Sequence, residues 1–184
     1  ASAASRQRRS QTNNSTTASM TMSKQQGQTS NHVELPHQCS CPCGETKFTV
    51  ERTPFVRFYC HCEICQNLYK SGYADVVVVK SKYVQLDSND VNFKKYRLPP
   101  ALDRGTCKAC GKPAAGFLKG IPGLALSFIS ADNFLNKSAL PNPLGHVFYH
   151  RKQKEVEDAL PKINGYWKSE LKISAWILPR IASA

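Results

Sequence analysis

Three cysteines, Cys60, Cys62 and Cys65, lie within the short segment CHCEIC. Thiolate sulfur is a strong ligand for zinc, and the spacings C-x-C and C-x-x-C each allow two sulfurs to reach one ion. Structural zinc sites normally have four protein ligands, whereas catalytic zinc sites keep one position for water or substrate. The three cysteines therefore predict a catalytic zinc site whose fourth position is open.

Four more cysteines form two pairs, and a glycine follows each pair, in the segments CPCG and CKACG. Alternate residues of an extended segment point the same way, so both sulfurs of CPCG can reach one ion. A C-x-x-C turn directs backbone N–H groups at the sulfurs, and the following glycine permits the positive φ that such a turn often needs. We expect these pairs to form one structural four-cysteine zinc site that contributes to folding. Its ligands would be Cys41, Cys43, Cys107 and Cys110.

The eighth cysteine, Cys39, leaves two alternatives open. It belongs to a C-x-C-x-C run, so Cys39 could replace Cys43 as the partner of Cys41, although Gly44 favours the second pair. Otherwise Cys39 is a spare thiol or the fourth ligand of the Cys60–Cys62–Cys65 site. A closed site with four cysteine ligands would be inert, and the chain would then have two structural zinc ions.

The overall composition favours metal sites over disulfides. No apolar run resembles a signal peptide or a membrane span, and the cysteine spacings are difficult to distribute into separate disulfides. We therefore expect a cytoplasmic protein with no membrane association. The formal charge is +12 in 184 residues. Thiolates bound to zinc would reduce that charge, so it gives little reason to expect a nucleic-acid partner.

The first 30 residues contain Arg6, Arg8, Arg9 and Lys24, no acidic residue and no aromatic residue. A segment so rich in Ser, Thr, Gln and Asn cannot bury enough apolar surface to fold. We expect residues 1–30 to be a disordered basic tail, with an organellar transit peptide as the alternative, and residues 31–184 to be a single zinc-binding β domain.

Short β-strands dominate the pattern after about residue 37. Alternating or β-branched runs predict strands in TKFTVE, AAGFL, LALSFIS, HVFYHR and KISAWIL, and two strands or one bent strand in YADVVVVKSKYVQL. Only EVEDALPKI has helical spacing, and Pro161 would shorten that helix. The prediction is a mainly β fold of stacked antiparallel sheets with few short helices.

Two histidines are candidates for proton transfer. In an extended HVFYHR segment, His146, Phe148 and His150 would share one face, so we expect His146 to approach the reactive centre as acid, base or substrate donor. His61 lies between two ligands, and the same alternation would point it away from the metal. Arg104 and Arg151 could meet substrate carboxylates, but the simpler interpretation of each is a solvated surface charge.

The order of CPCG, CHCEIC, CKACG, GHVFYHRK and VEDALPKINGY resembles the family of glutathione-dependent formaldehyde-activating enzymes, which includes centromere protein V. The likeness covers about residues 37–168. It implies a β-tent fold with a structural zinc on Cys41, Cys43, Cys107 and Cys110 and a catalytic zinc on Cys60, Cys62 and Cys65. It also implies carbon–sulfur lyase activity on adducts such as S-hydroxymethylglutathione.

This chain departs from many relatives after the central motif. The segment QNLYKSGYADV adds Leu68, Tyr69 and Tyr73, which we expect to reshape the pocket and to alter which thiol it accepts. A small thiol such as glutathione is the expected partner. The alternative function is a zinc-stabilised binding module for a protein, cytoskeletal or nucleic-acid partner, as centromere protein V suggests.

Overall fold

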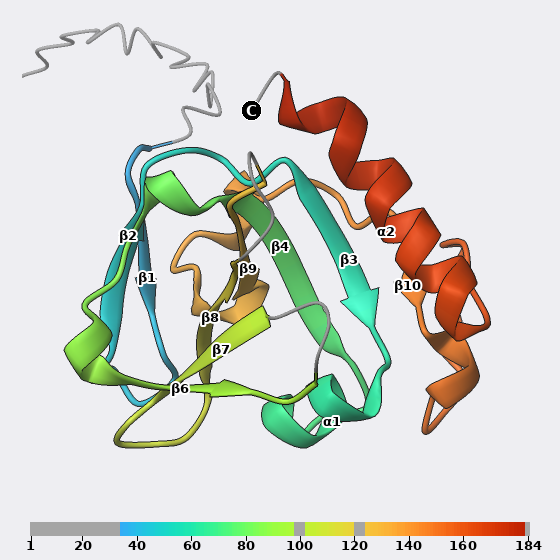
Figure 1. Cartoon of the computed structure of the whole chain (residues 1–184), viewed down its shortest axis with the longest axis horizontal. Helices are drawn as coiled ribbons and strands as arrows, with labels where there is room; N and C mark the ends of the chain where they lie inside the picture. Colours follow the sequence, from blue (N-terminus) through green and yellow to red (C-terminus); the bar gives the residue numbers. More distant parts are fainter. Residues whose placement is uncertain (1–33, 98–101, 120–123, 183–184) are drawn as a thin grey trace, which may run out of the picture. The chain divides into compact units, whose positions relative to one another are not determined.

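The computed structural model describes residues 34–97, 102–119 and 124–182 of the chain. It confirms the mainly β prediction, with two β-sheets and two α-helices in these ranges (Figure 1). The tail predicted for residues 1–30 lies outside the described residues. In the described ranges, no helix has both the length and the apolar character needed to cross a membrane.

The strands form a small and a large sheet. The small sheet has the order β1 (His37–Ser40), β2 (Lys47–Val50) and β5 (Val84–Gln85). The large sheet has the order β10 (His146–Val147), β3 (Val56–Cys60), β4 (Ala74–Lys80), β9 (Leu126–Ser130), β8 (Pro113–Leu118), β7 (Leu102–Cys107) and β6 (Val91–Lys95). All neighbouring strands pair antiparallel except β10 and β3, which are parallel.

The helices connect or follow these strands. The two α-helices are α1 (Glu63–Tyr69) and α2 (Tyr166–Ile181), and α2 lies beside β3 and β10 (Figure 1). Short 3-10 helices span Ser81–Tyr83, Ser88–Asp90, Ala131–Asn133, Lys137–Ala139 and Tyr149–Arg151.

Strand β4 is buried on both faces of the large sheet, which explains its uninterrupted run of valines. Val77 and Val79 pack in a core that also contains residues of β1 and β2. Val76 and Val78 pack on the opposite face, with residues of α1 and α2. The large sheet therefore separates two apolar layers, and both α-helices contribute to only one of them.

The segment KISAWIL was predicted as a strand, but it forms the second half of α2. Its apolar residues Ile173, Trp176 and Ile177 follow the three- and four-residue spacing of one helix face, and this face packs in the second apolar layer. In the sequence, the β-branched isoleucines favoured a strand, so the helical spacing of these residues was overlooked. Burial of a helix face against the sheet has outweighed local strand propensity.

The helix predicted in EVEDALPKI is absent, since residues 152–165 form an irregular segment with bends and one isolated β-bridge, at Lys162. The backbone groups of this segment find other partners. The Tyr149 hydroxyl accepts from the Val156 N–H at 2.9 Å, and the Asp158 carboxylate accepts from the Leu160 N–H at 3.2 Å. The Pro161 carbonyl accepts from the His146 N–H at 2.8 Å, so the segment runs along β10.

The strand predicted in HVFYHR is also shorter than expected. Strand β10 ends at Val147, because Phe148 adopts a left-handed conformation with φ 55° and a 3-10 turn follows. Left-handed φ is costly for a bulky side chain. The Ser169 hydroxyl of α2 accepts from the Phe148 N–H at 2.7 Å and helps to hold this conformation.

We predict that replacement of Trp176 will destabilise the fold strongly. Trp176 is 8% exposed and packs on Phe58 with a ring-centroid distance of 6.2 Å. Trp176→Ala should lower the free energy of unfolding by about 3–5 kcal/mol, measured by urea denaturation. Trp167→Ala is the matched control, because Trp167 lies on the same helix but is 76% exposed; it should change stability by less than about 0.5 kcal/mol. Equal effects of the two substitutions would contradict the position of α2.

Candidate functional site

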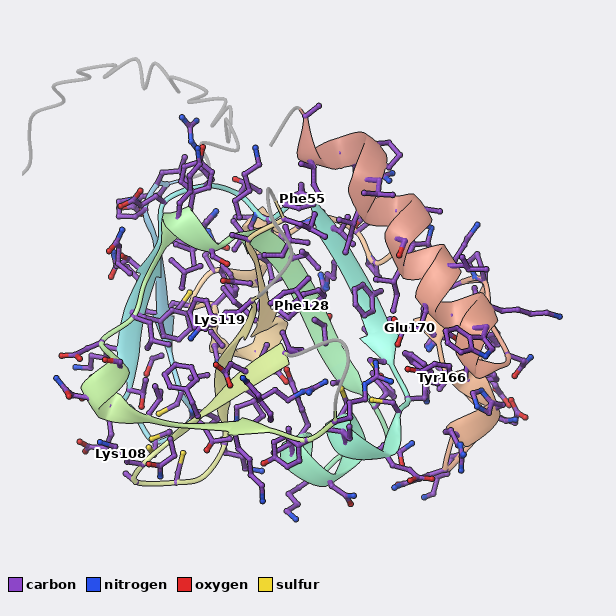
Figure 2. The ribbon with its side chains drawn as sticks, viewed as in Figure 1. Phe55, Lys108, Lys119, Phe128, Tyr166 and Glu170 are labelled. Carbon is purple, nitrogen blue, oxygen red and sulfur yellow. The ribbon has the colours of Figure 1, made fainter. Side chains whose placement is uncertain are left out.

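Four cysteine thiols lie together where the β1–β2 loop meets the β7–β8 turn, beside Lys108 in Figure 2. The Cys41 and Cys43 sulfurs are 3.2 Å apart, and the Cys43 and Cys107 sulfurs are 3.7 Å apart. The four sulfur atoms lie within 4.8 Å of one another. They are Cys41, Cys43, Cys107 and Cys110, the set predicted from sequence.

The glycine that follows each cysteine pair has the positive φ that was expected from the sequence. Gly44 and Gly111 have φ values of 82° and 69°, and their N–H groups donate to the Cys41 and Cys107 carbonyls at 2.9 Å. Burial opposes ionisation of Cys107, but hydrogen bonds from Thr46 and from the backbone N–H groups of Cys110 and Ala109 lower the pKa of its thiol to about 6. The turns therefore favour a thiolate at this position.

Cys39 lies in neither cysteine cluster. It is 3% exposed, pairs with Phe48 in the β1–β2 ladder and packs in the apolar core between the two sheets. Burial raises the pKa of the Cys39 thiol to about 12. Of the alternatives left open by the sequence, the structure supports the spare thiol, because the second cysteine cluster packs on the opposite face of the large sheet.

The second cluster contains Cys60, Cys62 and Cys65, whose sulfur atoms lie within 4.8 Å of one another. Cys60 ends β3, Cys62 is the N-cap of α1, and Cys65 lies in the first turn of α1. In the described part of the chain, no fourth cysteine, histidine or carboxylate completes this group. The connection between β3 and α1 thus brings three sulfur atoms together, and no further metal ligand from the described residues joins them.

Ionisation in this cluster is uneven. Hydrogen bonds from the Cys60 and Cys65 thiols lower the pKa of Cys62 to about 3, and Arg104 contributes in the same direction. The pKa of Cys60 is raised well above its usual value by its hydrogen bonds to Cys62 and Cys65 and by burial. Without a cation the cluster would therefore carry one thiolate. A divalent cation would favour ionisation of the other two thiols as well.

Both clusters fit a metal ion by their donor chemistry. Sets of four and three mutually close thiols, all free of disulfides, match the soft ligands that zinc accepts. The four-thiol set would complete a tetrahedral site, whereas the three-thiol set would leave one position to a non-protein ligand.

A cavity of about 530 Å³ adjoins the three-thiol cluster. Its walls are formed by β3, β4, β7, β8, β9, α1 and α2, and all three sulfur-bearing residues line it. Aliphatic and aromatic side chains form most of the remaining lining. Figure 2 shows Tyr166 and Glu170, two of the lining residues, on the side of α2 that faces the sheet.

Three arginines also line the cavity, and they differ in their partners. Arg97 forms a 2.5 Å ion pair with Glu170 of α2, and Arg151 forms a 2.7 Å ion pair with Glu63 of α1. Arg104 has no carboxylate within ion-pair distance in the described ranges, and the Tyr96 ring lies 6.0 Å from its guanidinium. Arg104 therefore brings to the cavity a positive charge that no carboxylate of the described ranges pairs with, and this charge also favours the Cys62 thiolate.

His150 also lines the cavity, from the 3-10 turn that follows Phe148. Its Nδ1 accepts from the Gly165 N–H at 2.9 Å, so the neutral ring carries its proton on Nε2. The Gln66 amide ties this turn to the cysteine segment, because it donates to the carbonyls of His61 and Arg151, each at 2.8 Å. His150 is thus held at the cavity with an N–H group that can donate a hydrogen bond.

His146 does not line the cavity, in contrast to the sequence expectation. The expected shared face with Phe148 and His150 is lost, because the chain turns at Phe148. The His146 side chain is fully buried; its Nε2 donates to Asp158 at 2.8 Å, and its Nδ1 accepts from the Nε2 of His61 at 2.9 Å. His61 is also buried, and its Nδ1 has no hydrogen-bond partner among the described residues.

The sequence interpretation missed the contribution of α2 to the cavity and underestimated Arg104. The signal for α2 was present, since Ser169, Ile173, Trp176 and Ile177 follow a helical period. Arg104 gave no such signal, because only the folded sheet brings β7 close to the cysteine segment. Leu68 and Tyr69 line the cavity as expected, while Tyr73 packs on Tyr59 and His61.

One of the comparisons with known proteins identifies a family for this chain. Residues 36–151 match the family described as glutathione-dependent formaldehyde-activating enzyme, and the chain belongs to that family. The comparison with curated proteins gives no match. A crystal structure of a Rhodobacter sphaeroides protein is similar over 58% of this chain and 91% of its own length, with 14% identity and a TM-score of 0.44. A likeness at this level says nothing about function.

We predict that the two clusters bind metal independently and with different effects on folding. The purified chain should contain two ions, and either Cys110→Ser or Cys62→Ser should remove about one of them, measured by elemental analysis. Cys110→Ser should also lower the melting temperature more, because its cluster joins two distant segments.

Cys39→Ala is the control for this experiment, since Cys39 is buried outside both clusters. It should keep both ions. Loss of an ion in Cys39→Ala would contradict the assignment of ligands.

Proposed function

We propose that the chain is a zinc-dependent carbon–sulfur lyase that cleaves or forms adducts between a small thiol and an aldehyde. The observation that carries this proposal is the three-thiol cluster on the wall of a 530 Å³ cavity. The contrast with the four-thiol cluster supports it, because a complete ligand set stabilises a fold whereas an incomplete set can bind a substrate. The family description supports glutathione and formaldehyde as the thiol and the aldehyde.

In this proposal Cys60, Cys62 and Cys65 hold the catalytic zinc, and the other four clustered cysteines hold the structural zinc. When bound at the three-thiol site, zinc would supply Lewis-acid stabilisation of the negative charge that develops as the C–S bond breaks. Substrate binding and the movement of the proton would depend on residues of the chain around the cavity.

Cleavage of an S-(1-hydroxyalkyl) adduct breaks the C–S bond and gives a free thiol and an aldehyde. The electron pair of that bond stays on sulfur, the hydroxyl group loses its proton as the carbonyl forms, and the sulfur gains a proton. His150 lines the cavity, and its neutral ring carries a proton on Nε2, so it can donate a hydrogen bond that stabilises the departing sulfur while the hydroxyl proton passes to that sulfur. The reverse reaction uses the same groups in the opposite order.

Arg104 would bind and orient the anionic substrate. A glutathione adduct carries carboxylates, and the Arg104 guanidinium lacks a carboxylate partner in the described ranges. Fixing the adduct beside the sulfurs also removes part of the entropic cost of the reverse, bimolecular reaction.

For His146 we propose a positioning role in place of direct proton transfer. Asp158 holds the His146 ring, and His146 in turn accepts from His61, which lies between Cys60 and Cys62. This buried chain of hydrogen bonds would fix the cysteine segment and so the spacing of its sulfurs.

Loss of one sulfur of the three-thiol site should abolish activity without unfolding the chain. We expect Cys62→Ser to lower kcat/KM for the glutathione–formaldehyde adduct by at least about 100-fold, because it removes a direct ligand. The assay follows release of formaldehyde from the zinc-loaded protein. Cys39→Ser is the control and should retain activity. The proposal fails if the zinc-loaded protein changes no rate of adduct formation or cleavage for any small thiol.

Removal of the Arg104 charge should weaken substrate binding. A charge-assisted hydrogen bond contributes about 1.5–3 kcal/mol, so Arg104→Gln should raise KM by about 10- to 100-fold, whereas Arg104→Lys should recover part of the loss. Arg52→Gln is the control, because Arg52 lies outside the cavity lining. A KM unchanged in Arg104→Gln would exclude this arginine from substrate binding.

A further inference from the structure

The cavity is much more apolar than a formaldehyde adduct of glutathione requires. Glutathione is anionic and formaldehyde adds only one carbon, so such an adduct has little surface to match aliphatic walls. Much of the apolar lining comes from β8, from β9 and the residues just before it, and from α2. These residues are Leu118, Leu124, Leu126, Phe128, Ile173, Ile177 and Leu178.

The apolar walls extend away from the sulfurs along β4. Cys60 pairs with Ala74 at one end of this strand, and Leu126 pairs with Lys80 at the other end. At 3.3 Å per residue, the two ends are separated by about 20 Å. Cys60 and Leu126 both line the cavity, so it is elongated, with thiols at one end and aliphatic side chains at the other.

Helix α2 closes the apolar part of the cavity from outside the matched family region. It begins at Tyr166, whereas the family match ends at residue 151. Ion pairing of Arg97 with Glu170 holds α2 against the segment that follows β6. The apolar wall therefore has two sources, β8 and β9 with the residues beside them in the matched region and this C-terminal helix outside it.

From this arrangement we propose that the substrate is an adduct of an anionic thiol with a medium-chain aliphatic aldehyde. The proposal rests on the lyase function argued above and specifies its substrate class. The thiol part lies at the polar end, near Arg104, and the alkyl chain carried by the hydroxylated carbon lies between α2 and β9. Cleavage then transfers the C–S electron pair to sulfur, moves the hydroxyl proton to sulfur and releases the alkyl aldehyde.

Two measurements on the full-length, zinc-loaded protein test this proposal. The first is kcat/KM for glutathione adducts of formaldehyde, butanal, hexanal and octanal. The second is the affinity for unreactive S-methylglutathione and S-hexylglutathione by calorimetry. Each buried methylene should improve both quantities by roughly fourfold until the cavity is filled.

A matched pair of substitutions on α2 identifies where the chain binds. Ile173 lines the cavity, while Leu171, two residues away, is 70% exposed and does not. Ile173→Asn should weaken S-hexylglutathione binding by about tenfold or more with little effect on S-methylglutathione, and Leu171→Asn should change neither. If Ile173→Asn does not fold, Leu178→Asn replaces it, because Leu178 lines the cavity but is 60% exposed.

The outcomes separate this proposal from the lyase function. Equal affinity for the methyl and hexyl compounds, or an equal response of the two α2 variants, would overturn the apolar substrate class. Cleavage of adducts without dependence on chain length would overturn it too, while the lyase function stands. Chain-dependent binding that depends on Ile173, without cleavage of any adduct, would support the apolar compartment and reject the lyase function.

Discussion

Three cysteine sulfurs held within 4.8 Å of one another cannot all ionise unless a cation compensates their charge. The connection between β3 and α1 imposes this proximity, since one sulfur ends the strand and the others lie in the N-cap and first turn of the helix. Burial of Cys60 and Cys65 removes solvent screening and strengthens the constraint. The arrangement is therefore suited to a metal ion, and all three sulfur-bearing residues line the cavity that the rest of the fold encloses.

The large sheet supplies that enclosure. Because β4 is buried on both faces, it separates the apolar core shared with β1 and β2 from the layer that contains the three-thiol cluster and α2. Cys39 lies in the first layer and the three-thiol cluster in the second, so a residue close in sequence to other ligands is kept away from the open coordination position. The four-thiol cluster joins β1–β2 to β7–β8, which sets the position of β7 and hence of Arg104. A structural metal site at one end of the sheet would thus help to shape the site at the other.

The cysteine spacings were sufficient to predict both clusters, because short C-x-C and C-x-x-C segments carry their geometry locally. Most strands were predictable for the same reason, since alternation is a local property. The errors came where distant parts of the chain decide local structure. Phe148 adopts a positive φ beside Ser169 of α2, and that turn separates His146 from His150. Helix α2 was assigned to a strand because its isoleucines favour strands, whereas packing against Phe58 selects the helix.

Packing between distant parts of the chain also forms the cavity, because α2 and the large sheet both line it. The residues that would do chemistry lie within the matched family region, on β3, α1, β7 and the turn after β10. The apolar wall combines residues of β8 and β9 with residues of α2. The apolar face of α2 packs on the sheet, and the Arg97–Glu170 ion pair helps to hold the helix there. Under the proposed function, part of the surface that would select the substrate therefore lies on α2, outside the segments that carry the thiols. A change in the C-terminal helix can alter which adduct enters the cavity while the thiol cluster beside it keeps its ligands and its geometry.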